Sequence, residues 1–382
     1  MMSSLEAEAE GDTEMPYDPA AMEPILDIYF DGFRWVMANT SSVRLRLDVD
    51  DGYVRLAKDL LPKPGGDLAG FIKVQKGGLP EIAKLADEKS AWYMAGRITL
   101  TDEHRRGLKK FVDGYIDLMD SMFTSPAESA TSSDTTQMEA MAVWTELMAV
   151  MGPYAGRWID CLRGDMVASF DLPEGQPFQF VEAFGMVDGN GCADLVSELS
   201  HELVKAVGST EEMSDTFTVA RGPEIAGSES LVMTFDMMEM LDEMGQASDE
   251  HAEAMLKTMY GEEFSAAMVT ADDIVLAAGG ANAVARLGEL AADLPTPGKA
   301  PSFSPLEVRP GLMFGMNLGA MLNWVKNAVP EGAADLDGAA ERLIGDAGRI
   351  PMAMTFGSEI ATFETAVSLE TIEAIATIAQ EQ

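Results

Sequence analysis

Residues 43–57 alternate between apolar and polar side chains with a period of two, which is typical of half-buried β-strands. In the segment SVRLRLDVDDGYVRLAK every second residue from Val43 to Val49 is apolar, and the alternation resumes after Gly52. Asp51 and Gly52 separate the two runs, and this pair favours a two-residue turn because both of its central residues must accept a positive φ. The segment therefore predicts a β-hairpin.

The acidic residues of this turn raise the alternative of a calcium-binding loop. An EF-hand loop that begins at Asp48 needs a glycine at its sixth position and a bidentate glutamate at its twelfth. Tyr53 occupies the sixth position and Asp59 the twelfth, so the glycine comes one residue too early. The frame favours the hairpin over a metal site.

An antiparallel hairpin followed by an amphipathic helix recurs about four to five times along the chain, at irregular spacing. EFSAAMVTADDIVLAAGG, for example, predicts a hairpin that turns at Asp272 and Asp273 and runs into the helix ANAVARLGELAADL. A strand over residues 91–100 likewise leads into a helix that Thr101 caps. Hairpins followed by helices predict an α+β fold, with antiparallel sheets built from repeated hairpin-helix units and helices packed on one face.

The segment 124–136, TSPAESATSSDTT, is rich in Ser and Thr and has no apolar periodicity, which is typical of a linker. We therefore predict an N-terminal α+β part at residues 19–123 and a C-terminal α+β part at residues 137–382. Residues 1–18 are acidic and predict a disordered tail.

The net charge of the chain argues against some classes of binding partner. There are 64 acidic and 26 basic residues among 382, so the net charge is −38. A field of that sign repels phosphate backbones and anionic membrane surfaces, which argues against nucleic-acid binding. The arginines of the first hairpin, Arg44, Arg46 and Arg55, stand out in this background. We expect one face of the hairpin to meet an acidic surface, either of its own helices or of a neighbouring copy.

The sequence leaves two cellular compartments possible for this protein. Cys161 and Cys192 are the two cysteines, and either one disulfide or two reduced core thiols is consistent with them. The chain has no run of 18 apolar residues, so no transmembrane helix is predicted. The first residues lack the basic and apolar regions of a signal peptide. We expect an extracytoplasmic protein, periplasmic or secreted, if a signal segment is missing from this chain, and a cytoplasmic one otherwise.

Motifs for common catalytic chemistry are missing. His104, His201 and His251 lie on predicted helices, and none has a second histidine at zinc-motif spacing. The chain has no G-x-S-x-G nucleophile elbow, P-loop or G-x-G-x-x-G motif. A carboxylate pair of the glycosidase kind is not singled out among 64 acidic residues. We expect no cofactor, no catalytic residues and no metal site.

Methionine is the strongest compositional anomaly, with 28 residues of this type. One reading is core packing by a flexible side chain, another is an adaptable apolar groove for a lipid, a peptide or a partner helix, and a third is thioether binding of Cu(I). The groove reading rests on a cluster with partly helical spacing: Met233, Met237, Met240, Met244, Met255 and Met259.

The recurring strand-turn-strand-helix units and the closing segment GRIPMAMTFGSEIATFETAVSLETIEAIATI resemble uncharacterised exported bacterial α+β proteins of the DUF3352-like kind. The resemblance spans about residues 40–380 and is one of pattern. It implies an exported, non-enzymatic binding or structural role, and it supplies no catalytic residues.

Together these features lead us to expect a non-enzymatic binding or scaffold protein with a Met-rich apolar groove or core and an apolar or protein ligand. The alternatives are a hydrolase that uses paired carboxylates and a structural subunit of a larger assembly. A cleft with two acidic side chains of raised pKa would favour the hydrolase, and a broad exposed apolar face would favour the assembly.

Overall fold

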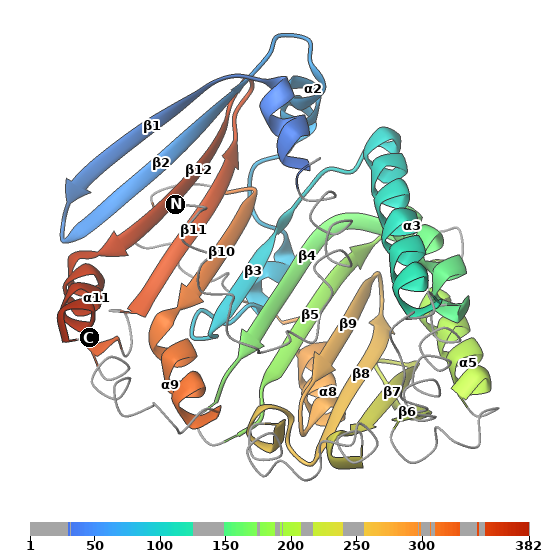
Figure 1. Ribbon diagram of the computed structural model, residues 1–382. Coiled ribbons are helices and arrows are strands. Elements are labelled where there is room, and N and C mark those ends of the chain that lie inside the picture. The colour runs from blue at the N-terminus through green and yellow to red at the C-terminus, as the bar shows by residue number, and fades with distance from the viewer. Residues whose placement is uncertain are drawn as a thin grey trace.

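A computed structural model shows one antiparallel sheet of 12 strands with helices around it (Figure 1). The structure describes residues 32–124, 149–207, 217–239, 256–328 and 348–381, together with residues 30, 342 and 343, apart from short gaps at 174–175, 188–191, 193, 297, 299–305 and 307–309. The strands are β1 Thr40–Asp50, β2 Tyr53–Pro62, β3 Trp92–Arg97, β4 Leu162–Asp171, β5 Gln179–Met186, β6 Phe217–Ile225, β7 Ser228–Asp236, β8 Glu263–Ala271, β9 Ile274–Gly279, β10 Leu312–Asn317, β11 Arg349–Phe356 and β12 Ala361–Ser368. The helices are α2 Asp67–Val74, η1 Glu81–Leu85, α3 Asp102–Thr124, α5 Leu195–Val207, α8 Ala283–Asp293, α9 Leu318–Ala328 and α11 Leu369–Glu381, and residues 149–161 are also helical.

The sheet is assembled from hairpins of consecutive strands, as the sequence pattern predicts. Its order is β1-β2-β12-β11-β10-β3-β4-β5-β9-β8-β7-β6, and every neighbouring pair is antiparallel. Hairpins β4-β5, β8-β9 and β11-β12 are each followed by a helix along the chain. The predicted α+β class with antiparallel sheet is therefore confirmed.

Strands from before and after the predicted linker lie side by side in this sheet. β2 pairs with β12, and β3 pairs with both β4 and β10. The two predicted parts thus share backbone hydrogen bonds at three strand pairs of one sheet. The predicted tail at residues 1–18 and residues 125–136 of the predicted linker lie outside the described residues.

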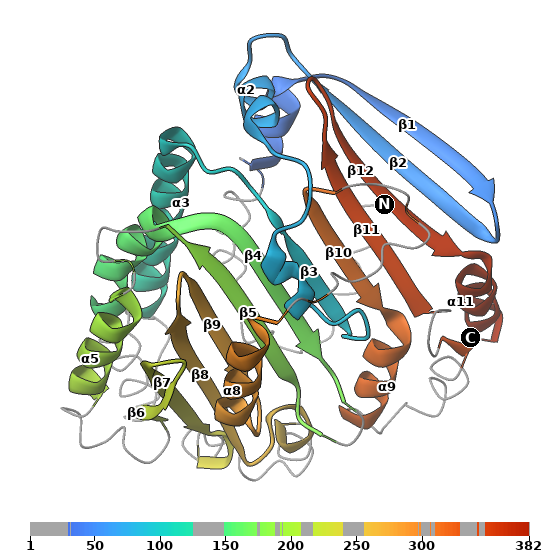
Figure 2. The ribbon, with the colours of Figure 1, turned by 180° about the vertical axis from the view of Figure 1, so that it is seen from behind.

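The main hydrophobic core lies on the face of the sheet that α8 and η1 cover (Figure 2). Leu287 and Leu290 of α8 pack against alternate residues of β8 and β9, such as Val269 and Leu276, and these side chains are almost fully buried. Small inward residues such as Ala278 let the helix approach the sheet closely.

Helices also lie on the other face of the sheet, whereas the sequence predicts helices on one face only. Leu199 and Leu203 of α5 pack on Leu231 of β7, next to the partly buried Met268 of β8. Met268 and Val269 are consecutive in one strand, so they point to opposite faces. The β6–β9 end of the sheet is therefore sandwiched between α5 and α8.

Local turn and cap chemistry follows the sequence. Asp51 and Gly52 have φ of 45° and 82°, as the predicted two-residue turn requires, and Asp272 turns the β8-β9 hairpin with φ of 53°. The Thr101 hydroxyl accepts a hydrogen bond of 3.3 Å from the backbone N–H of His104, which caps α3.

Cys161 and Cys192 form a disulfide, which decides between the two readings of the cysteines. The bond ties the end of helical residues 149–161 to the segment before α5, and both cysteines are buried beside Leu195 and Val196 of α5. It holds these two segments of the helical layer together.

Candidate functional site

One face of the sheet carries large apolar side chains that remain partly exposed to solvent. In β3, β10 and β11 this face carries Trp, Met, Phe, Ile and Leu side chains and Gly96, while several residues between them, such as Ala95, Gly315 and Ala353, are small and buried on the other face. We call this surface the open face and define it by Trp92, Met94, Phe314, Met316, Met352 and Met354.

Strand register aligns these residues into rows across neighbouring strands, and the central row runs from β1 to Leu231 of β7, which faces Arg221 of the edge strand β6. Each member of the central row is the direct partner of the next one: Leu47, Leu56, Thr365, Met352, Phe314, Met94, Ala168, Glu182, Ala277, Met268 and Leu231. At one end Leu231 is fully buried under α5, whereas Leu47 at the other end is 67% exposed. Side chains that face each other across strands lie within contact distance, so the row forms a band that is apolar except at Thr365 and Glu182.

Glu182 of β5 is the one acidic side chain in this row. Ala168 and Ala277 lie directly opposite on the two neighbouring strands, and Phe180 and Phe184 precede and follow it on the same face. Among the described residues, none donates a hydrogen bond to its carboxyl group or pairs with it. Burial alone raises the pKa of Glu182 above its usual range, because desolvation disfavours the charged form.

The aromatic residues around Glu182 mark the boundary between the covered and open parts of this face. Trp158, from helical residues 149–161, meets the Phe184 ring edge-on at 6.5 Å between centroids. On the other side Phe170 stacks on Phe178 at 4.9 Å. The carboxyl group therefore sits between aromatic rings at the place where the helical layer ends.

The structure describes only some of the methionines of the predicted groove. Met233 lies on β7 beside the α5 cluster and is partly buried, and Met237 and Met259 are also partly buried near the same end of the sheet. Met240, Met244 and Met255 lie outside the described residues. The groove at these positions stays a prediction.

The methionines of the open face were missed by the sequence reasoning, although a signal for them existed. Met352 and Met354 alternate with Pro351 and Ala353 in RIPMAMTF, and LMFGMN and WYMAGR show a related pattern of large and small residues. A period of two that separates large from small apolar residues indicates two differently packed faces. The predicted methionine cluster rests on helical spacing, which residues of a strand do not follow.

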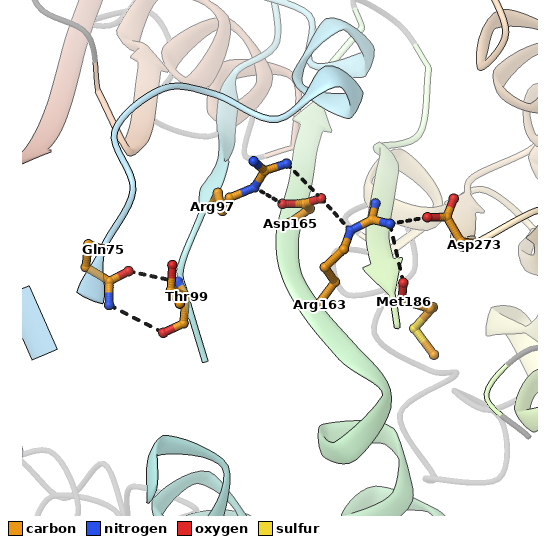
Figure 3. Close-up of polar contacts among 7 residues, drawn as sticks. All are labelled: Gln75, Arg97, Thr99, Arg163, Asp165, Met186 and Asp273. Carbon is orange, nitrogen blue, oxygen red and sulfur yellow. Dashed lines mark hydrogen bonds and ion pairs between the residues drawn. The ribbon is translucent and has the colours of Figure 1, made fainter. Parts of the chain in front are cut away.

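A hollow of about 480 Å³ on the opposite face is lined by charged side chains, and Figure 3 shows the contacts among several of them. Its charged lining includes Glu81, Lys84, Arg97, Arg163, Asp165 and Asp273. Asp165 of β4 is 2% exposed and accepts hydrogen bonds from Arg97 Nη2 at 3.2 Å and Arg163 Nε at 2.7 Å. Arg163 also donates to Asp273 and, at 3.4 Å, to the Met186 carbonyl oxygen.

This network binds strand ends together rather than presenting free charge. Burial raises the pKa of Asp165, but the hydrogen bonds from Arg97 and Arg163 outweigh burial and hold that pKa below its usual range. Lys84 Nζ donates to the carbonyl oxygens of Leu294 and Thr296, each at 2.6 Å. Each of the three cations in the described lining of the hollow thus already has an oxygen partner, which argues against an anion site there.

Two carboxyl groups of raised pKa are described, but they are not a catalytic pair. Burial raises the pKa of Asp171 as well as that of Glu182. Asp171 follows Phe170 in β4, and Phe170 shares the face of Glu182. The two carboxyl groups therefore point to opposite faces of the sheet, where they cannot act on one bond. Within the described ranges no group of three His, Cys, Asp or Glu side chains is placed to hold a metal ion.

Two further findings concern the chain as a whole. In the part of the chain that the structure describes, no helix combines the length and apolar character needed to cross a membrane. Comparison with protein-family models, curated proteins and solved structures found no match.

Proposed function

We propose that this protein is a non-enzymatic binding protein that holds an apolar ligand of the lipid class on its open face. The observation that carries the proposal is the row from Leu47 to Glu182, which crosses eight neighbouring strands and in which five large apolar side chains stay partly or largely exposed: Leu47, Leu56, Met352, Phe314 and Met94. Exposed apolar patches of this extent mark binding surfaces in soluble proteins.

The side chains of the open face are suited to binding apolar ligands of varied shape. Methionine is unbranched and polarizable, so Met94, Met352 and Met354 can repack around acyl chains of different shape. The row offers few directed hydrogen-bonding groups, since Thr365 and Glu182 are its polar members. Apolar pockets with few placed polar groups are typical of small-molecule sites, where those groups set the orientation of the ligand. Glu182 is then the polar contact for the ligand's headgroup.

The disulfide supports the extracytoplasmic location that we propose for the protein. Structural disulfides form and persist in oxidising compartments and are rare in the cytosol. Cys161 and Cys192 are buried and join two helical segments, as a structural disulfide does.

Fluorescence of the neutral apolar probe N-phenyl-1-naphthylamine, with oleic acid as competitor, tests the proposal. The double variant Met94→Gln/Met352→Gln makes the centre of the row polar and is expected to weaken probe binding by about fivefold or more, given the apolar area lost. Met151→Gln/Met321→Gln is the matched control, because these methionines are 44% and 38% exposed away from the row. Absence of probe binding, or equal loss in both double variants, would refute the proposal.

A further inference from the structure

The exposed edge of the sheet at β1 carries an arrangement of charges that is complementary to itself. From Arg44 to Asp50 the sequence reads RLRLDVD, with two arginines before Leu47 and two aspartates after it. The four charged side chains share one face of the strand, and Leu45, Leu47 and Val49 share the other. We infer that β1 pairs antiparallel with β1 of a second copy of this chain, about a two-fold axis at Leu47.

The register follows from the charges. An axis at Leu47 places Arg46 opposite Asp48 of the second copy and Arg44 opposite Asp50, so that all four contacts join opposite charges. Moving the axis to Leu45 would oppose Arg44 to Arg46, and moving it to Val49 would oppose Asp48 to Asp50. Like charges directly opposite each other destabilise a strand pair, so the Leu47 register is selected.

Backbone geometry supports the same register. Asp50 and Tyr53 flank the two-residue turn and are therefore a hydrogen-bonded pair within the hairpin. Backbone groups alternate in direction along a strand, so the N–H and C=O of Leu45, Leu47 and Val49 point outward, away from β2. At an axis through Leu47 these outward groups of the two copies meet as hydrogen-bonded pairs.

The charges on β1 have capacity left for a second copy. Arg46 donates to Asp59 at 3.1 Å and Arg55 donates to Asp50 at 3.0 Å, so two of the hairpin's three arginines meet carboxylates within the hairpin itself. Yet Arg46 remains 57% exposed and Asp50 50% exposed. Among the described residues Arg44 and Asp48 are exposed and have no ion-pair partner. A second copy would satisfy them.

The apolar side of β1 also favours a partner of the same sequence. Val43, Leu45, Leu47 and Val49 are 45–67% exposed on an edge strand, and a row of exposed apolar side chains at a sheet edge favours pairing with another strand. At the opposite edge of the sheet, by contrast, Phe217 and Val219 of β6 are buried under the α5 layer. Pairing through β1 would bring Leu47 of the two copies together and join the two open faces into one surface.

A charge-swap experiment tests the inference by analytical ultracentrifugation across the micromolar range. The variants Arg44→Glu/Arg46→Glu and Asp48→Lys/Asp50→Lys each oppose like charges, so each alone is expected to dimerise at least about tenfold more weakly than the unsubstituted chain. An equimolar mixture of the two restores opposite charges at all four contacts and is expected to recover the dimer. The control Lys73→Glu/Lys110→Glu lowers the net charge as much as the arginine variant does, at exposed helical positions, and is expected to dimerise normally.

Leu47→Lys is the second variant, because it disturbs neither ion pair within the hairpin and places two ammonium groups on the axis. It is expected to be a folded monomer, with circular dichroism of the unsubstituted chain. A monomeric unsubstituted chain at every concentration, a dimer insensitive to Leu47→Lys, or a mixture of swapped variants that stays monomeric would each overturn the inference.

Discussion

Replacing Asp165 with asparagine tests whether the Arg97–Asp165–Arg163 network holds the strand ends together (Figure 3). The substitution keeps the shape of the side chain but removes its charge and turns an N–H₂ group toward two guanidinium donors. Breaking a buried ion pair by removing one partner costs about 3–5 kcal/mol. Arg97 and Arg163 are 38% and 36% exposed and can regain water, so we expect a loss near the lower end, about 3 kcal/mol.

Urea unfolding monitored by circular dichroism measures this loss. Asp273→Asn removes the outer carboxylate of the same network, which is 41% exposed, and is expected to lower the free energy of unfolding by less than about 1 kcal/mol. A loss for Asp165→Asn no larger than that of the Asp273→Asn control would refute the reasoning.

The pH dependence provides a second criterion for Asp165. Its pKa is lower in the folded than in the unfolded protein, so the unfolded state takes up a proton first as the pH falls. The stabilisation by the ionised carboxylate is therefore complete above the unfolded pKa and is lost as the pH falls through the folded pKa. We expect the stability difference between the unsubstituted chain and Asp165→Asn to be constant near neutral pH and to shrink in acid.

Three other outcomes are expected. Removing the disulfide by Cys161→Ala/Cys192→Ala should lower the free energy of unfolding by about 3–4 kcal/mol from loop entropy across the 31-residue separation, and two free thiols in a thiol assay of the native oxidised protein would contradict the bond. Glu182→Gln should raise the free energy of unfolding at pH 7 by about 1 kcal/mol, because it removes a buried charge, and the gain should vanish below the unfolded pKa, where the carboxyl is protonated in both states. Gly315→Ala should lower the thermal midpoint by several degrees, because its methyl group would lie 2.2 Å from the buried Tyr93 ring and an overpacked core loses about 1–3 kcal/mol; an unchanged midpoint would show that the ring can move.

Much of the fold could be predicted from local pattern. The period of two in residues 43–57 and the Asp51-Gly52 pair specified the β1-β2 hairpin, and Thr101 specified the start of α3. These features depend on neighbours in the chain, whose geometry backbone sterics and hydrogen bonding fix directly.

The candidate site was harder to predict, because its residues are far apart in the sequence. Met94, Met352 and Phe314 come together only because β10 lies between β3 and β11. Alternation identifies which side chains share a face of a strand, but it does not identify which strands are neighbours or which face a helix covers. The search for a methionine groove at helical spacing therefore pointed to Met237 and Met240 instead.

The sequence by itself determined the hairpins, their turns, the α+β class and the self-complementary charges of RLRLDVD, because each depends on residues that are close in the chain. Only the tertiary structure decided that β2 pairs with β12, that α5 and α8 cover opposite faces of one end, and that Glu182 stands without a described partner in an apolar row. These features depend on long-range pairing and on burial, which the whole chain sets together and which no local pattern encodes.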